Sequence, residues 1–509
     1  MSWSKGYVAD IGYTAGFYRE TTPAHMAFAA LAAGRSPERA LKPSSVLELG
    51  FGQGFGLCVL AAANPDVAFE GLDFNPEHVA HARRLIEGAA LTNVKVDEVG
   101  FEEAAARDGN NDVDVVSLHG IFSWVDRPAQ DAIVSIIRQR LRPNGMAYVS
   151  YNCLPGWAPI APIRHLMMEV KKRNAGRSER QLALALDLVK KLRQGNAGYF
   201  AANSVAAQHV DHMLSLDRTY LAHEYLDAHW ELLQFSEAAE RLSAAKLNYV
   251  CSATMSENID QYAVPPELQP LLAETDDPVL KEIIRDFACA KRFRRDIYVR
   301  GSTSLTEAEL TSMLRKTSFA LALPRKHVTL KFIGPLSELT GHEDIYHPIL
   351  DALADQNASF DELLALKAFG ETRRAMLLDC LALLVHSHQV LPILAPVADV
   401  EAAHRFNRMV VGHARAGRIY SHLASPVART GVPVNDFGLL TLAAIYDGRA
   451  DDAAAVARHA MSILNVMGRR PMKEGKSLSD DGEAIVFLAQ TMQPILNDMV
   501  PIWRRLGVI

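Results

Sequence analysis

VLELGFGQG, Val46 to Gly54, joins a short apolar run to a segment with glycine at every second position. An apolar run of this length that leads into glycines is typical of a buried strand. Glycine at positions 50, 52 and 54 permits positive φ angles and lets the backbone approach a ligand closely. The pattern predicts a first strand that ends in a ligand-binding turn; a tight turn without a ligand is the alternative.

An alternation of strands and helices continues from this turn to residue 151. Apolar runs at residues 45–49, 67–73, 94–99, 113–118 and 146–151 are separated by helical segments, which is typical of a parallel sheet with crossover helices. Asn75 and Pro76 carry the signals of a helix start, and Asn64 with Pro65 those of a helix end. We therefore expect a doubly wound α/β fold in the first third of the chain.

Composition limits the remaining possibilities. At 509 residues and 49% hydrophobic, the chain exceeds the size of a single core, so about three domains are expected. A formal net charge of −6 opposes general nucleic-acid binding. The five cysteines are scattered without a CxxC pair, and no signal peptide or long apolar run is present. We expect a soluble, cytoplasmic protein without membrane spans, disulfides or bound metal.

The glycine turn departs from the dinucleotide fingerprint GxGxxG, because Phe55 stands where the third glycine would be. NAD is therefore disfavoured but not excluded. The motif present is ExGxGxG, followed by Asp73 at the end of the second predicted strand. This combination resembles the class I S-adenosylmethionine-dependent methyltransferases. The resemblance implies a Rossmann-like methyltransferase sheet and S-adenosyl-L-methionine as cofactor.

The same resemblance assigns roles to individual residues. The glycines would wrap the methionine part of the cofactor, with Glu48 orienting its ammonium; Asp73 would hold the ribose hydroxyls and Phe74 would cover the adenine. An acid at a strand end can equally be a solvated cap. The complete set of expected cofactor-binding residues is Glu48, Gly50, Gly52, Gly54, Asp73, Phe74, Phe101, Glu102 and His119.

Further segments narrow the resemblance to bacterial methyltransferases that carry a methyltransferase regulatory domain. They are YTAGFYRETTPAHMAFAA (13–30), LDFNPEHVAHAR (72–83), LHGIFSWV (118–125), SYNCLPGW (150–157) and YLAHEYLDAHWELLQF (220–235). Some members of this group, the rickettsial type, are protein lysine methyltransferases. The likeness implies that this chain N-methylates lysine side chains of a protein.

Lysine methylation requires a neutral amine, and an aromatic, poorly hydrated channel lowers the amine pKa from about 10.4. Methyl transfer itself requires mainly positioning and exclusion of water. The expected catalytic residues are His119, Trp124, Tyr151, Asn152, Tyr13 and Tyr18, with Phe122, Trp157 and Phe17 as further aromatic candidates and Tyr13, Phe17 and Tyr18 forming a lid. His119 is the only general-base candidate among them; ordinary packing is the alternative for each. LHGI replaces the Asn-Pro-Pro-Tyr type of motif, which counts against methylation of DNA bases or glutamine.

Four regions are predicted: a methyltransferase domain (1–157), a helical regulatory or dimerisation region (158–300), a winged-helix-like module (301–396) and a helical C-terminal domain (397–509). Residues 179–195 repeat leucines at helical spacing and could pack in the core or against a second subunit. His209 and His212 are expected to be a surface pair rather than a metal half-site. Residues 291–302 are read as a charged strand rather than as a partner contact.

About 350 residues lie outside the predicted catalytic sheet, and recognition of a small metabolite would rarely need so much surface. We expect a protein substrate, no nucleic acid and a possible homodimer, with the winged module acting as a scaffold or protein-binding domain. Two rivals stay open. One is a methyltransferase for a small metabolite or glycan, and the other is a cofactor-binding regulator without turnover.

Overall fold

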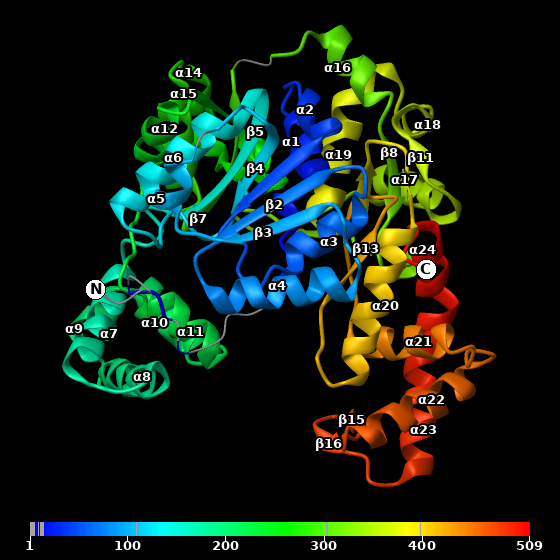
Figure 1. Cartoon of the computed structure of the whole chain (residues 1–509). Helices are drawn as coiled ribbons and strands as arrows, with labels where there is room; N and C mark the ends of the chain where they lie inside the picture. Colours follow the sequence, from blue (N-terminus) through cyan, green and yellow to red (C-terminus); the bar gives the residue numbers. More distant parts are fainter. Residues whose placement is uncertain (1–5, 9, 11–14, 108, 302–303, 398) are drawn as a thin grey trace.

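The computed structural model describes residues 6–8, 10, 15–107, 109–301, 304–397 and 399–509. Its centre is a seven-stranded sheet with the order β3-β2-β1-β4-β5-β7-β6 (Figure 1). The first five strands are parallel: β1 (Ser45–Leu49), β2 (Ala68–Asp73), β3 (Val94–Glu98), β4 (Val113–Leu118) and β5 (Leu141–Asn152). The five predicted strands are confirmed, although β5 begins five residues earlier than expected.

Helices cover both faces of the sheet, as a doubly wound fold requires. Val46 and Val115 point into one core, while the adjacent Leu47 and Val116 point into the other. The first core is covered by α1 (Pro23–Ala32), α3 (Phe55–Ala63) and α4 (Pro76–Gly88); the second is covered by α5 (Phe101–Ala105), α6 (Arg127–Arg140) and α12 (Phe235–Ser243). Short helix α2 (Glu38–Leu41) precedes β1. As predicted, the Asn75 side chain accepts from the Glu77 N–H and caps α4, and α3 ends at Asn64.

Two strands from beyond residue 240 complete the sheet. β7 (Phe293–Arg300) inserts antiparallel between β5 and β6 (Leu247–Ser252). The predicted charged strand is therefore present. Its Arg294, however, is buried and forms ion pairs with Asp286, Asp296 and Glu282 inside the protein. The sequence did not place β6 or β7 in the methyltransferase sheet.

A helical lobe lies between β5 and α12 in the chain and has its own apolar core. It comprises α7 (Ala161–Arg173), α8 (Ser178–Gln194), α9 (Gly198–Ala202), α10 (Ser204–Met213) and α11 (Arg218–Leu226). Short helices α13 (Asp260–Ala263), α14 (Gln269–Glu274) and α15 (Pro278–Ala288) separate β6 from β7. The long helical stretch predicted from residue 158 is thus present.

The region after β7 is a small α+β unit, as predicted. It contains α16 (Glu307–Leu314), β8 (Ser318–Leu321), hairpin β9 (Lys331–Ile333) and β10 (Glu338–Thr340), α17 (Glu343–Asp355), β11 (Ala358–Ser359), α18 (Phe360–Leu364), α19 (Arg374–His386) and β12 (Val390–Ile393). Strands β11, β8 and β12 form one antiparallel sheet. Both predicted capping boxes, Thr306 with Glu309 and Ser359 with Glu362, are confirmed.

The C-terminal region is mainly helical but also holds two hairpins. Its elements are α20 (Glu401–Arg415), β13 (His422–Ser425), β14 (Thr430–Pro433), α21 (Asp436–Tyr446), α22 (Ala453–Val466), β15 (Met472–Lys473), β16 (Lys476–Ser477), α23 (Asp481–Pro494) and α24 (Val500–Arg505). Helix α20 and hairpin β13–β14 pack directly on α3. The C-terminal region therefore touches the helix that follows the glycine turn.

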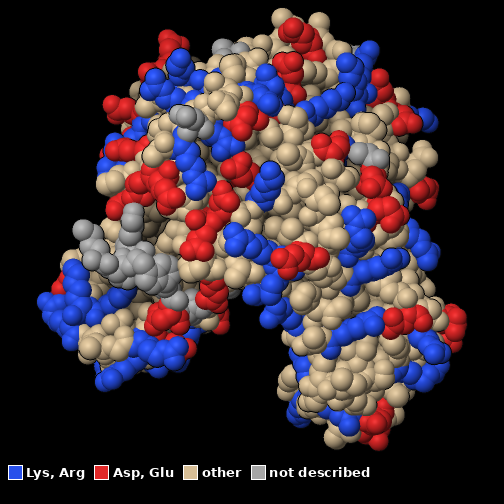
Figure 2. Space-filling model, in the orientation of Figure 1, with Lys and Arg blue, Asp and Glu red and all other residues tan. Residues whose placement is uncertain are grey.

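Two lobes extend from the same side of the central sheet (Figure 1): α7–α11 form one, and α21–α23 form the other. Figure 2 shows a broad hollow between them. In the described part of the chain, every helix is too short or too polar to cross a bilayer.

Candidate functional site

The glycine turn between β1 and α3 lies where strand order reverses, since β1 has β2 on one side and β4 on the other. Ligands of open α/β sheets bind at this switch point. Gly50, Gly52 and Gly54 all have positive φ, at 71°, 58° and 71°. A Cβ at Gly50 would lie 2.5 Å from Ile121 Cδ1, and one at Gly54 would lie 2.5 Å from Ala82 Cβ. Larger residues are therefore excluded at both positions by conformation and by space.

Asp73 at the end of β2 braces this turn. Its Oδ2 accepts from the Gly52 N–H at 2.9 Å, and its Oδ1 accepts from the Asn75 N–H at 2.9 Å. His78 Nδ1 lies 3.2 Å from the same Oδ1. A carboxylate has about four lone-pair sites, so acceptor capacity remains for ribose hydroxyls. Asp73 links turn and strand end in one rigid unit; its contact with a ribose stays a prediction.

Glu48 is the acidic residue nearest to the glycine turn within β1. The residue is half-buried, and the loss of hydration together with the nearby Asp73 charge raises its pKa to about 8. An ammonium group placed beside it would favour the ionised carboxylate. The residues present thus fit a ligand with an amino-acid end and a ribose, which is the chemistry of S-adenosylmethionine.

The adenine side is the least defined part of the predicted site. Phe74 follows Asp73 and meets the Tyr7 ring edge-on, with centroids 5.6 Å apart. Phe101 and Glu102 are the first residues of α5, just after β3, and both are partly buried. Their positions are compatible with the predicted roles, which stay predictions.

His119, at the end of β4, lies in an aromatic stack. Its ring centroid is 3.7 Å from that of Tyr18 and 5.9 Å from that of Tyr148, and its Nδ1 is 2.8 Å from the Tyr148 hydroxyl. Burial and the Arg295 charge lower the His119 pKa to about 4. The imidazole is therefore neutral near pH 7, and it is too weak a base to hold a proton taken from an alkylammonium group.

The N-terminal segment brings Tyr18 to this stack. Gly16 O lies 3.3 Å from the position that a Cβ on Gly56, in the first turn of α3, would occupy. Phe17 packs against His422 with ring centroids 4.7 Å apart. Tyr18 and Phe17, two of the predicted lid residues, thus lie next to the glycine turn. Tyr13, the third, lies outside the described residues.

The other predicted aromatic residues divide into two groups. Phe122 and Tyr151 are fully buried, and the Tyr151 hydroxyl donates to Asp296 at 2.8 Å, inside the sheet. Trp124 and Trp157 instead both contact Trp230, with centroids 6.4 and 5.2 Å away. The structure therefore brings the two tryptophans together, but it keeps Tyr151 apart from His119 and Tyr18.

This tryptophan group contains a stacked cation. Arg164 Cζ lies 4.6 Å from the Trp230 ring centroid and 5.6 Å from that of Trp124. Asn152 is also buried, and its backbone N–H donates at 2.8 Å to Oγ of Ser123, the residue before Trp124. Trp230, Arg164, Tyr7 and the α11 residues are not among the site residues predicted from the sequence. Trp230 and the α11 residues from Tyr220 onward lie in segment 220–235, which resembles the family, whereas no motif in the sequence pointed to Arg164 or Tyr7.

His209, half of the predicted surface pair, faces inward, with Nε2 2.5 Å from the Tyr225 hydroxyl. Among the residues that the structure describes, no group of three or more histidine, cysteine or acidic side chains could hold a metal ion.

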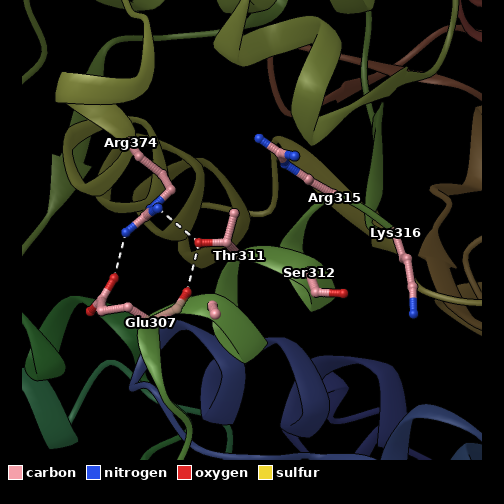
Figure 3. A pocket seen from close by; sticks show the side chains of 7 residues that line it. Glu307, Thr311, Ser312, Arg315, Lys316 and Arg374 are labelled. Carbon is pink, nitrogen blue, oxygen red and sulfur yellow. Dashed lines mark hydrogen bonds and ion pairs between the residues drawn. The ribbon is translucent and has the colours of Figure 1, made fainter.

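A second depression, of about 600 Å³, lies between α16 and α19, away from the switch point (Figure 3). Arg374 is paired with Glu307 at 2.5 Å and with Thr311 at 2.8 Å. Arg315 is paired with Asp361. These charges are already balanced within the protein, so we assign no ligand there.

Comparison with known proteins identifies the domains of the chain. A family described as "Methyltransferase domain" matches residues 47–147, and one described as "Predicted methyltransferase regulatory domain" matches residues 217–300. The protein sll1526 of Synechocystis is 32% identical over 511 residues, covering 100% of both chains. RP789 of Rickettsia prowazekii is 27% identical over 56% of this chain and 51% of its own.

The fold has a solved counterpart. PKMT2 from Rickettsia typhi, in complex with AdoHcy, superposes with a TM-score of 0.70 at 19% identity, covering 95% of this chain and 98% of that one. This similarity extends over the accessory regions as well as the central sheet. The chain therefore belongs to the S-adenosylmethionine-dependent methyltransferases that carry a methyltransferase regulatory domain.

Proposed function

We propose that this methyltransferase N-methylates lysine side chains of a protein substrate. The observation that carries the proposal is the aromatic stack at the end of β4, where Tyr18 lies against a neutral His119. A lysine amine must be neutral to attack a methyl group, and poorly hydrated aromatic surroundings lower its pKa. Aromatic faces also bind the ammonium form while it approaches.

Bound S-adenosylmethionine would supply an activated methyl group. The residues that would hold it are the backbone of the glycine turn, Glu48 and Asp73, with Phe74 against the adenine. The protein's own contribution is to fix the acceptor nitrogen next to the methyl carbon and to exclude water. No covalent intermediate with the protein is required.

A peptide, rather than a small amine, is supported by buried donors near the tryptophan group. Among the described residues, the indole nitrogens of Trp157 and Trp230 and the amide nitrogen of Asn152 are buried without an acceptor in the protein. Such donors are costly to leave unpaired, and because these atoms are closed to solvent, carbonyl groups of a bound chain would satisfy them only if the tryptophan group opens on binding. The resemblance to rickettsial protein lysine methyltransferases points to the same substrate class.

Self-association is part of this proposal. Helix α8 exposes Leu184 (38%) and Leu192 (36%), and burial of these side chains against a second copy would remove apolar surface from water. Light scattering on the purified protein tests self-association, because a dimer has twice the mass of the single 55.9 kDa chain. A cytoplasmic location stays a prediction.

The test of the substrate is transfer of labelled methyl groups from S-adenosylmethionine to a bacterial extract. Label in macromolecular protein, located on lysine by mass spectrometry, supports the proposal. Label only in small molecules or glycans favours the first rival, and cofactor binding without any transfer favours a regulator. The control is Asp97→Asn, an exposed acid at the end of β3 paired with Arg107, which should leave transfer intact.

A further inference from the structure

Helix α11 reaches both sides of the predicted cofactor site. On the β2 side, the His223 ring lies 5.5 Å from Tyr7, which in turn meets Phe74 at 5.6 Å. The regulatory-domain match begins at residue 217, just before this helix. The first element of that domain is therefore linked to the predicted adenine side of the site through the Tyr7 ring.

On the β4 side, Tyr220 of the same helix lies within electrostatic reach of Tyr18. Tyr18 in turn stacks on His119 at 3.7 Å. Tyr220 is 48% exposed, so its ring borders open space rather than the core of the lobe. Helix α11 thus borders the place where the acceptor must meet the methyl group.

Glu224 lies one helical turn after Tyr220 and therefore on the same face of α11. The Tyr220 hydroxyl is hydrogen-bonded to its carboxylate. The opposite face of the helix packs on the apolar residues Leu182, Ala185 and Val189 of α8. Glu224 is thus a partly accessible acid beside the exposed Tyr220 ring, with Arg164 of α7 near its carboxylate.

The ionisable groups around Glu224 determine its proton affinity. Those that act on it directly are Tyr220, Tyr225, Asp227 and Arg164. In the next layer, Lys171 and Tyr7 face Asp227, and Tyr18 faces Tyr220. Burial is the main cause that raises the Glu224 pKa to about 7, and Asp227 adds to it while Arg164 opposes it. Glu224 is therefore half-ionised near neutral pH.

We propose that Glu224 is the catalytic base that takes the proton from the incoming lysine ammonium group. The ammonium N–H bond breaks and its proton passes to the Glu224 carboxylate. The neutral nitrogen then bonds to the methyl carbon as the carbon–sulfur bond breaks, and that electron pair stays on sulfur. Glu224 afterwards releases its proton to water. This step rests on the proposed lysine specificity.

Other candidates in the neighbourhood fit this role less well. His119 is too weakly basic, and burial raises the Tyr148 and Tyr151 pKa values well above their usual range. Asp227 has a pKa of about 7 as well, but it is buried, and its Oδ1 already accepts from the Val8 N–H at 2.8 Å. Glu224 is the partly accessible acid of the group.

The test compares wild type with Glu224→Gln over pH 5.5–9.5, using full-length protein, S-adenosylmethionine and a lysine peptide mapped from the labelled extract. Wild-type kcat/KM should rise with pH and level off above about pH 7, as Glu224 becomes ionised. The variant should lose ~100-fold or more of the rate at pH 7. Its residual rate should keep rising tenfold per pH unit with the fraction of free amine. Glu179→Gln, an exposed acid on α8, should match wild type throughout.

Two readouts do not depend on turnover. AdoHcy affinity should be unchanged in Glu224→Gln, because the proposed role is toward the acceptor. The thermal midpoint of the variant relative to wild type should increase from pH 5 to pH 8.5, because only wild type carries a partly buried anion above its pKa. Loss of AdoHcy binding in a folded variant would overturn the assignment.

The outcomes separate this proposal from the lysine specificity. If wild type methylates lysine but Glu224→Gln keeps the wild-type profile, Glu224 is not the base and the lysine specificity stands. If wild type labels an acceptor without an amine, both fall. Should the variant not fold, the wild-type profile decides, because a rate that continues to rise tenfold per unit beyond pH 7 contradicts a base with a pKa near 7.

Discussion

Glu48→Gln should abolish a pH dependence of cofactor binding that the wild-type protein shows. The pKa of Glu48 is raised to about 8 by burial and by the Asp73 charge. The free protein therefore holds this carboxyl mostly protonated at pH 7. A bound ammonium group would stabilise the carboxylate, so binding should release a proton and strengthen as pH rises through 8.

The magnitude follows from the pKa. A carboxyl with a pKa of about 8 is ionised ~1% of the time at pH 6 and ~90% at pH 9. If the ligand pairs only with the ionised form, AdoHcy should bind ~90-fold more weakly at pH 6 than at pH 9, or ~2.7 kcal/mol. At pH 9 the affinity of the glutamine variant for AdoHcy should be ~10-fold or more lower than that of wild type, because a charged hydrogen bond is lost.

Isothermal titration calorimetry of AdoHcy binding from pH 6 to pH 9 measures this effect. Repeating the pH 7 titration in two buffers with different ionisation enthalpies counts the released protons, and about one is expected. The ligand's own amino group also titrates, so the difference between wild type and Glu48→Gln isolates the carboxyl. Equal pH dependence in the two proteins would refute the reasoning.

Three further changes test the site and the fold. Asp73→Ala should remove both braces on the glycine turn and abolish AdoHcy binding by calorimetry, while unchanged affinity would contradict the assigned role. Gly54→Ala places a methyl group 2.5 Å from Ala82 Cβ at a φ of 71°, so AdoHcy affinity should fall at least ~10-fold; wild-type binding would show that the turn adapts. Arg294→Met leaves buried acids without their cation and should lower the free energy of unfolding, measured in urea, by ~3–5 kcal/mol. The loss should be larger at pH 8 than at pH 5, because Asp286, whose pKa is about 7, is ionised at pH 8.

The parallel part of the fold could be predicted because its signals are local. Strands β1 to β5 are apolar runs, and turn residues such as Gly54 and Asn75 mark where each helix begins. β7 could not be assigned to the sheet in this way. Its Arg294 and Asp296 look like surface charges in the sequence, whereas in the fold they neutralise each other inside the protein.

The candidate site also has one part with local sequence signals and one part without them. The glycine turn and Asp73 lie within 24 residues of each other, and one motif contains them. The proposed acceptor side instead combines Tyr18, His119 and Tyr220, which are separated by about 100 residues at each step. No spacing rule relates such positions, so only the three-dimensional packing of α11 against the N-terminal segment could reveal Glu224 as a neighbour of the site.

The regions outside the central sheet also anchor the segment that carries Tyr18. The number of residues in these regions could not predict this role. Arg19 donates to the carbonyl oxygens of Val385 and His386 at the C-terminal end of α19, where a cation is favoured by the helix dipole. Phe17 packs so closely on β14 that a Cβ at Gly431 would lie 2.8 Å from its ring. Tyr18, between these two anchors, points to His119 instead. The middle and C-terminal regions therefore fix the position of Tyr18 in the proposed acceptor site, which gives the chain outside the central sheet a structural role at that site.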